Sequence, residues 1–276
     1  MQHQRFALDS PTLEDLLVED ERRMALEEAG PGGSPGSLGV LSSPLSPSDD
    51  APSMRQRAAE ARARARLRDD SVVLDLFQGQ YESRLQCEAC GLGSSTLDVF
   101  LALSLPVCAS VDTALRELTT REVLDAAEQW FCPRCRELRA ATKKITLVSL
   151  PTLLVLHLQR FDSKGNKLQQ RVSFPLEGLD LAPLVLHGAQ GAQGASMLDE
   201  DPEELGGGGG GLYDLFAVAK HHGSAIQGGH YTADVLCSDR VWRNMDDADV
   251  VERPPPDGED AEAYLLFYRR QLTPFE

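Results

Sequence analysis

The sequence predicts an α+β fold, and two observations from different parts of the chain lead to this prediction. Helical patterns occupy the amino-terminal quarter, and from Ser71 onward short runs rich in Val, Leu, Phe and Tyr alternate with turn residues, as β-strands do. The chain has 276 residues, 42% of them hydrophobic, which is enough for one large domain or two small ones. Fibrous and wholly disordered proteins are therefore excluded.

Two helices separated by a disordered insert are predicted before the strands begin. Residues 1–30 contain a helix with a Ser-Pro start and a Gly-Pro stop. Residues 31–53 are a run of Pro, Gly and Ser that cannot form a core, so this insert is predicted to be disordered. Residues 54–68 are rich in Ala and Arg and predict a second helix. Its arginines spread around the helix, which favours a solvated surface over a nucleic-acid-binding face.

The predicted ordered domain, residues 54–276, carries the strands. They are expected at 96–105, 144–150, 152–161, 171–174, 213–221, 230–236, 240–245 and 263–269. A mostly helical segment is expected at 113–130, with Asp112 as its cap. Residues 189–211 end in six glycines and predict a flexible surface loop, whose length adds little to the entropy of closing it.

Charge and hydropathy exclude two classes of partner. The formal net charge of −16 would repel a phosphate backbone, so no nucleic-acid partner is expected. The apolar stretches are broken and shorter than the roughly 20 residues of a membrane-spanning helix, so no membrane segment is expected. The amino terminus lacks the pattern of a signal peptide, which predicts an intracellular protein of the cytoplasm or the nucleus. In such a compartment the six cysteines are expected to be metal ligands or catalytic groups.

Four of the cysteines form two C-x2-C pairs, Cys87 with Cys90 and Cys132 with Cys135. Four thiolates from two such pairs are the tetrahedral ligand set that Zn²⁺ prefers. The gap between the pairs is longer than in compact zinc ribbons, so two unrelated reduced pairs or a redox pair remain alternatives. The sequence predicts a structural zinc site.

A histidine and a carboxylate stand on consecutive predicted strands. His230 follows Gly228 and Gly229, and glycines at such a place imply close approach of another chain to the backbone. Asp246 lies at the end of the next predicted strand. Antiparallel strands joined by a turn could bring Asp246 beside His230, and such a pair serves as the base and its orienting group in nucleophilic hydrolases. A lone structural histidine is the alternative.

The segment from about residue 70 to 270 resembles the catalytic domain of the ubiquitin-specific proteases in eight collinear motifs. It is most similar to the subgroup whose larger members carry DUSP and ubiquitin-like modules. The motifs are FQGQYESRLQCEAC, WFCPRC, ATKKITLVSLPTLLVLHLQRF, VSFPLEGLDL, YDLFAVAKHHGS, GGHYTADV, VWRNMDDADV and AYLLFYRR.

This resemblance implies a papain-like fold of fingers, palm and thumb and a cysteine-type deubiquitinase that hydrolyses the isopeptide bond after the carboxyl-terminal Gly of ubiquitin. His230 matches the general base and Asp246 the third member of the catalytic triad. Gly228, Gly229 and Tyr231 match positions that bind substrate. The two cysteine pairs match the zinc ligands of the fingers, and ubiquitin and ubiquitinated proteins are the implied partners.

One part of the family pattern is missing from the sequence. The box G-L-x-N-L-G-N-T-C, which carries the nucleophile, and the Gln-rich box after it do not occur, and neither Cys108 nor Cys237 stands where the family has its nucleophile. Residues 1–30 resemble the end of the thumb, so palm and fingers are expected with most of the thumb absent. The sequence is interpreted as part of a complete protease, because a His and Asp pair has little purpose without a nucleophile. A non-catalytic ubiquitin-binding pseudoenzyme or scaffold is the alternative.

Overall fold

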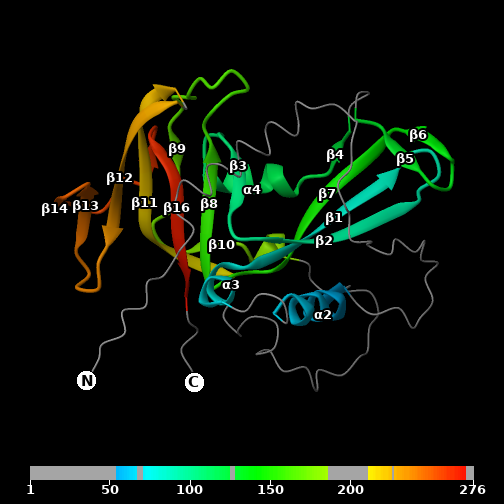
Figure 1. Ribbon diagram of the computed structural model, residues 1–276, viewed down its shortest axis with the longest axis horizontal. Helices are drawn as coiled ribbons and strands as arrows, with labels where there is room; N and C mark the ends of the chain where they lie inside the picture. The colour runs from blue at the N-terminus through cyan, green and yellow to red at the C-terminus, as the bar shows by residue number, and fades with distance from the viewer. Residues whose placement is uncertain (1–53, 67–70, 125–127, 186–210, 226, 272–276) are drawn as a thin grey trace, which may run out of the picture. The chain divides into compact units, whose positions relative to one another are not determined.

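The computed structural model describes most of the chain, in segments separated by gaps (Figure 1). The described residues are 54–66, 71–124, 128–185, 211–225 and 227–271. The expectations for residues 1–30 and 31–53 lie outside them, as does nearly all of the expected loop at 189–211. None of the helices in the described segments has the length and the apolar run that a bilayer crossing requires.

A large sheet of eight strands forms one half of the described fold (Figure 1). Its order is β14-β13-β12-β11-β16-β8-β3, and β10 also pairs with β11. All of these pairs are antiparallel except β3 with β8. The strands are β3 (Leu103–Pro106), β8 (Leu153–Gln159), β10 (Leu179–Asp180), β11 (Leu212–Ala225), β12 (Gly228–Leu236), β13 (Trp242–Asp246), β14 (Asp249–Glu252) and β16 (Ala263–Arg270).

A four-stranded sheet and two small ribbons make up the remaining sheets of the described residues. The four-stranded sheet has the order β2-β1-β7-β4, and β5 pairs with β6 and β9 with β15. The strands are β1 (Gly79–Cys87), β2 (Gly93–Phe100), β4 (Glu122–Val123), β5 (Trp130–Cys132), β6 (Glu137–Arg139), β7 (Ala141–Ser149), β9 (Val172–Ser173) and β15 (Glu259–Asp260). The mixture of helices and strands confirms the predicted α+β class.

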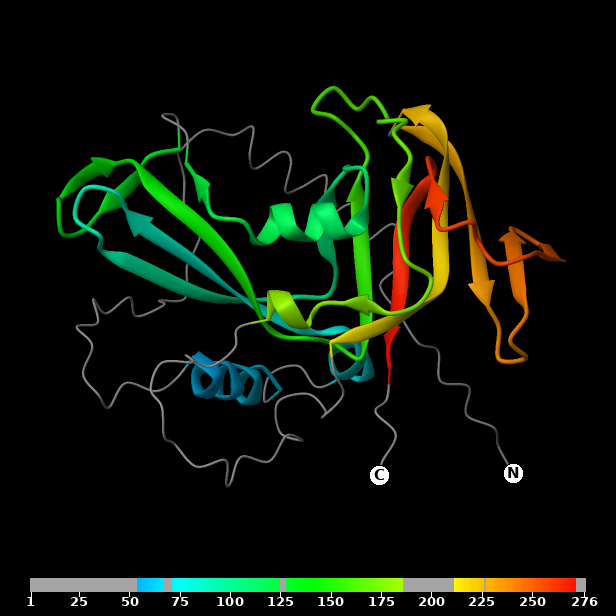
Figure 2. The ribbon, with the colours of Figure 1, turned by 180° about the vertical axis from the view of Figure 1, so that it is seen from behind.

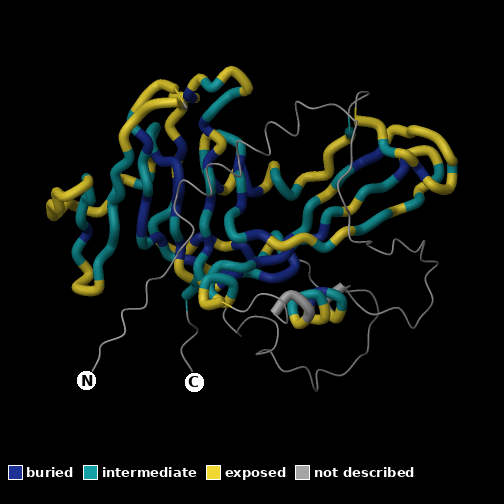
Figure 3. The backbone as a smooth tube through the Cα atoms, in the orientation of Figure 1, coloured by how far each residue is buried: buried dark blue, intermediate teal, exposed yellow. Residues whose placement is uncertain are grey.

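The described residues also form four short helical segments beside the sheets (Figure 2). They are α2 (Met54–Arg66), α3 (Val72–Phe77), α4 (Val111–Thr119) and the 3-10 turn η1 (Ala182–Leu184). Helix α4 buries Val111, Ala114 and Leu115 and contacts β3 and β7. Burial is concentrated in the middle of the large sheet, whereas β14 and β6 are exposed (Figure 3). The core therefore holds the central strands, while hairpins at the periphery carry the candidate sites.

A buried arginine ties the end of β8 to the segment that follows it, to β15 and to β16. The guanidinium of Arg160 donates hydrogen bonds to the backbone carbonyls of Leu168 (3.1 Å), Gln170 (2.8 Å), Asp260 (3.0 Å) and Ala263. Its side chain is fully buried, and burial lowers its pKa. The strand expected at 152–161 is present as β8, which ends at Gln159, and Arg160 follows it directly.

Two predicted elements differ from the structure. The helix expected at 113–130 runs only from Val111 to Thr119, and Ser110 rather than Asp112 caps it, accepting a hydrogen bond from the amide of Thr113 (3.1 Å). Its end is set by the Thr120 hydroxyl, which donates to a carbonyl of the last turn (2.6 Å) and so competes with helix continuation. The strand expected at 96–105 is two strands, β2 and β3, which belong to different sheets.

Candidate active site and metal centre

The hairpin of β11 and β12 and the neighbouring strand β13 bring His230 and Asp246 together. His230 lies opposite His222 of β11, and β12 continues into an antiparallel pairing with β13. Nε2 of His230 lies 2.5 Å from Oδ1 of Asp246. Both side chains are about half exposed, at 47% and 48%. The structure thus joins the two residues that the sequence analysis singled out, in a place that a substrate can reach.

The contact with Asp246 controls the electrostatics of His230. The hydrogen bond to Asp246 raises the pKa of His230, and the charges of Asp246 and Asp247 add to this effect. Asp247 has a positive φ of 50°, which places it in the tight turn that follows β13. Because Nε2 faces the carboxylate, Nδ1 is the ring nitrogen left for a proton donor from another residue. The arrangement suits an imidazole held in one orientation as a base.

The three expected substrate-binding residues have different surroundings. Gly228 has open space where a side chain would begin, so another chain could approach its backbone. At Gly229 a Cβ atom would overlap the ring of His221, so the packing of the fold itself requires glycine at this position. Tyr231 lies on the opposite face of β12 from His230 and packs against His221, with ring centroids 4.8 Å apart. The substrate-binding roles of the three residues stay predictions.

A polar network that sequence analysis missed lies on the same face as His230. Lys220 of β11 contacts Asp234 of β12 at 2.9 Å and Asp260 of β15 at 2.8 Å. These bonds raise the pKa of Lys220 against the opposing effect of burial. Asn244 of β13 also donates to Asp234 (2.8 Å). Period-two alternation from His230 would have placed Asp234 on this face, but nothing local in the sequence indicates Asp260 as its neighbour.

A second histidine and carboxylate pair adjoins the first. Nδ1 of His222 lies 2.7 Å from Glu262, and its Nε2 lies 2.8 Å from the hydroxyl of Thr232. The rings of His222 and His230 stack with centroids 6.2 Å apart. The Lys220 network and the pair of His222 and Glu262 line one cavity of about 430 Å³, which Asp246 also lines. We call His230 and Asp246 the dyad. The face of the sheet that carries the dyad is therefore polar, and its other polar side chains are hydrogen-bonded to one another.

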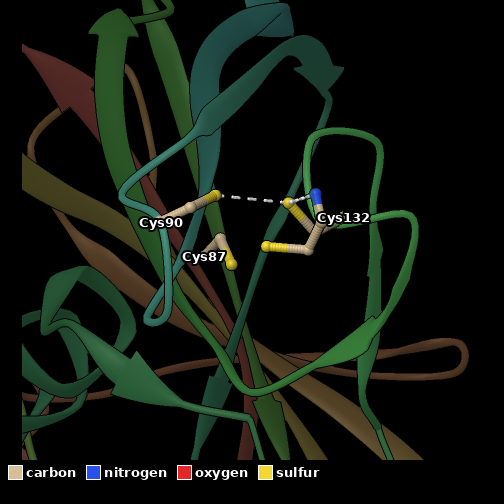
Figure 4. Close-up of side chains that lie close together, drawn as sticks. Cys87, Cys90 and Cys132 are labelled. Carbon is tan, nitrogen blue, oxygen red and sulfur yellow. Dashed lines mark hydrogen bonds between the residues drawn. The ribbon is translucent and has the colours of Figure 1, made fainter.

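The four paired cysteines converge at the outer end of the four-stranded sheet (Figure 4). Cys87 ends β1, and Cys132 ends β5. All four sulfur atoms lie within 4.8 Å of one another, with Cys90 Sγ 3.5 Å from Cys132 Sγ. Each turn after the first cysteine of a pair contains a residue with positive φ, Gly91 in one and Arg136 in the other, which turns the backbone back on itself.

The cysteine cluster has the chemistry of a closed metal site. Four sulfurs bound to one ion at about 2.3 Å lie about 3.8 Å apart at the corners of a tetrahedron, close to the separations found. Burial raises the pKa of Cys132, but the backbone amide of Cys135 and the other thiols outweigh it and lower that pKa to about 7. The thiol of Cys90, burial and the remaining thiols raise the pKa of Cys135 to about 12. A cation would relieve this competition among the four thiols.

The two remaining cysteines do not contact the dyad. The Cys108 thiol donates to Glu117 (3.2 Å), and burial together with that carboxylate raises its pKa to about 11. Cys237 follows the far end of β12, seven residues after His230, which corresponds to about 23 Å along an extended strand. Within the described segments, no cysteine therefore stands beside His230 as a nucleophile.

The sequence resembles known proteins along most of its length. A model of the family described as "Ubiquitin carboxyl-terminal hydrolase" matches residues 26–268. Ubiquitin carboxyl-terminal hydrolase 4 of Saccharomyces cerevisiae is 36% identical over 211 residues, which are 73% of this chain and 23% of that protein. Ubiquitin carboxyl-terminal hydrolase 2 of Gallus gallus is 35% identical over 213 residues, 73% of this chain and 54% of that protein. The chain spans about a quarter of the length of its yeast relatives.

Solved structures show the same likeness in three dimensions. The SAGA Ubp8/Sgf11/Sus1/Sgf73 DUB module bound to ubiquitin aldehyde matches with a TM-score of 0.57 and 28% identity, over 74% of this chain and 44% of that one. A structure of yeast SAGA DUBm with an Sgf73 mutant matches with a TM-score of 0.60 and 25% identity, over 80% and 48% of the two chains. The match supports the expected papain-like fold.

Proposed function

Because the chain belongs to the ubiquitin carboxyl-terminal hydrolase family, we propose that it is the part of a cysteine-type deubiquitinase that supplies the general base and the carboxylate of the catalytic triad. Its substrates would be ubiquitinated proteins, cleaved after the carboxyl-terminal Gly of ubiquitin. The single observation that carries this proposal is the 2.5 Å contact between His230 and Asp246 on exposed neighbouring strands. The relatives, which are ubiquitin hydrolases by name, support the substrate class.

In the proposed reaction, His230 and Asp246 have distinct roles. Nδ1 of His230 takes the proton of a cysteine thiol, while Asp246 holds the ring through Nε2 and stabilises the imidazolium that forms. The thiolate attacks the carbonyl carbon of the terminal Gly, and the C–N bond breaks as His230 returns its proton to the leaving lysine amine. Water, activated by the same Nδ1, then hydrolyses the thioester and restores the thiol. The tail of ubiquitin would run past the open backbone of Gly228.

The cysteine cluster supports a structural Zn²⁺ ion as the cofactor. Cys87, Cys90, Cys132 and Cys135 would be its four ligands, which closes the site to substrate and leaves no position for catalysis. The ion would hold the turn after β1 against the hairpin of β5 and β6. Thiols that bind zinc must stay reduced, which fits an intracellular protein of the cytoplasm or the nucleus. The motif pattern supports the subgroup with DUSP and ubiquitin-like modules.

A non-catalytic ubiquitin-binding module is the second candidate. One observation favours it, namely that no cysteine in the described segments stands beside His230. A module of this kind would hold ubiquitin without cleaving it. It would use the face of the large sheet that carries His230, together with the turn after β1 and the β5-β6 hairpin that would bind zinc. The two candidates share the ligand and differ only in turnover.

Turnover and binding of ubiquitin separate the two candidates. We expect the purified chain to bind ubiquitin in calorimetry, and a fluorogenic ubiquitin substrate tests whether it also cleaves. Cleavage that His230→Ala abolishes and Asp249→Asn leaves intact would support the protease, since Asp249 is a carboxylate of the same β13-β14 hairpin. Because none of the six cysteines of this chain stands beside His230, the assay is repeated with the amino-terminal segment of a relative, which carries the Cys box, added in trans. Binding without cleavage under both conditions would support the second candidate. Absence of both binding and cleavage would contradict the proposed function.

A further inference from the structure

Three cations lie side by side on one face of the four-stranded sheet. In the antiparallel register, Arg84 of β1 is directly opposite Lys144 of β7. Glu122 of β4 pairs with Lys143 of β7, so extending that register by one residue places Arg121 opposite Lys144. Residues directly opposite in a sheet share a face, which puts all three positive charges in one transverse row. We call Arg84, Lys144 and Arg121 the basic row.

The basic row lines a cavity of about 600 Å³ that contains no carboxylate among its described residues. Its six lining residues are Arg84, Gln86, Thr119, Thr120, Arg121 and Lys144. The hydroxyls of Thr119 and Thr120 already donate to carbonyls of helix α4. The Gln86 side chain is also engaged, because its oxygen accepts a bond from Arg121 and its amide donates to a backbone carbonyl at 3.4 Å. The donors left to face the cavity are therefore the charged groups.

No carboxylate within the described segments neutralises the basic row. Neighbouring cations do have partners, since Lys143 lies 3.6 Å from Glu122. Glu82, two residues before Arg84 on the same face of β1, is buried and accepts a hydrogen bond from Ser95 (2.5 Å). Like charges directly opposite each other destabilise a sheet. Three unneutralised cations in a protein with a net charge of −16 are therefore a local exception that calls for an anionic ligand.

We propose that the basic row binds a phosphate monoester carried on a side chain of a protein partner. A phosphate dianion offers three acceptor oxygens, and guanidinium groups bind such oxygens through paired hydrogen bonds. The cavity is large enough for the phosphoryl group together with the side chain that carries it. The field of the whole protein disfavours an extended polyanion, so a compact ligand with a concentrated charge fits better than nucleic acid. The site is separate from His230 and does not depend on the proposed protease activity.

Peptide binding to the whole chain tests this proposal. The probe is a short capped peptide of alanines with one phosphoserine at its centre, and the comparison ligands are the unphosphorylated peptide and inorganic phosphate, all measured by calorimetry. We expect the phosphopeptide to bind with a Kd below about 1 mM and the unphosphorylated peptide not to bind. The double variant Arg84→Gln with Lys144→Gln should weaken phosphopeptide binding about tenfold or more, since each loses a charged hydrogen bond.

Lys143→Gln is the matched control for this experiment. It removes the same charge from the neighbouring position of β7, but that lysine faces away from the row and is paired with Glu122. Circular dichroism and the thermal midpoint show whether each variant folds, and Arg121→Gln alone serves if the double variant does not. Equal loss in Lys143→Gln, or no phosphopeptide binding, would overturn the proposal. Binding of inorganic phosphate as tight as that of the phosphopeptide would mean an adventitious ion only and would overturn it too.

Discussion

Arg160 is a charged residue without access to solvent, and four backbone carbonyls accept the hydrogen bonds of its guanidinium. Arg160→Ala would leave these carbonyls without donors in the core, which should lower the free energy of unfolding by about 3 kcal/mol or more. Urea denaturation measures this loss. The control is Arg171→Ala, whose side chain is 59% exposed and pairs with Glu259 at 3.0 Å. An exposed pair contributes about 1 kcal/mol at most, so equal effects of the two variants would contradict the prediction.

His230 should titrate above its ordinary range because of Asp246. Asp246→Asn replaces the charged acceptor by a neutral amide oxygen, which favours the imidazolium less, so the pKa of His230 should fall. NMR titration of the His230 ring in the two proteins measures the change, with Asp249→Asn as the control. The stabilisation from the pair is fully present below the ordinary pKa of about 6.5 and is lost as the pH rises through the higher folded value. An unchanged pKa in Asp246→Asn would refute the role of that carboxylate.

The hairpin of β11 and β12 contains two neighbouring glycines with different constraints. Gly229→Ala forces a methyl group against the ring of His221 and should lower the free energy of unfolding by about 1–3 kcal/mol. Gly228→Ala meets open space and should change stability by less than about 0.5 kcal/mol. Thermal unfolding compares the two. If the tail of ubiquitin passes Gly228, that variant should bind ubiquitin more weakly while staying folded.

The β5-β6 hairpin and the turn after β1 have little apolar contact of their own, and exposed Phe131 and Leu138 illustrate this. If Zn²⁺ holds them together, Cys132→Ser should lower the zinc content from about one ion per chain to near zero and lower the thermal midpoint. Hydrogen exchange should accelerate first in these two turns and later in the large sheet. Cys108→Ser, a thiol outside the cluster, is the control. Full zinc content in Cys132→Ser would rule out the assigned ligand set.

At the scale of the whole molecule, strong local patterns in the sequence predicted individual strands well. They predicted poorly which distant segments pair with one another. Alternating or continuous apolar runs identified β8, β11, β12 and β16 within a few residues. Strand β1 was not predicted, because its sequence QYESRLQ is polar and its partners β2 and β7 define it. His230 and Asp246 could be paired because one turn joins their strands, and the cysteine cluster because its spacing is a known pattern. Asp260, Glu262 and the basic row depend on contacts between distant segments.

The position of β16 has a consequence for how the protein is made. In the large sheet this strand lies between β11 and β8, both of which precede it in the sequence. During synthesis β8 and β11 therefore emerge from the ribosome before the strand that joins them, and each presents an unpaired edge. Until residues 263–270 arrive, the nascent chain is open to pairing with other chains and to capture by chaperones. Assembly of the large sheet, and with it the core, is complete only after its last-made central strand is in place.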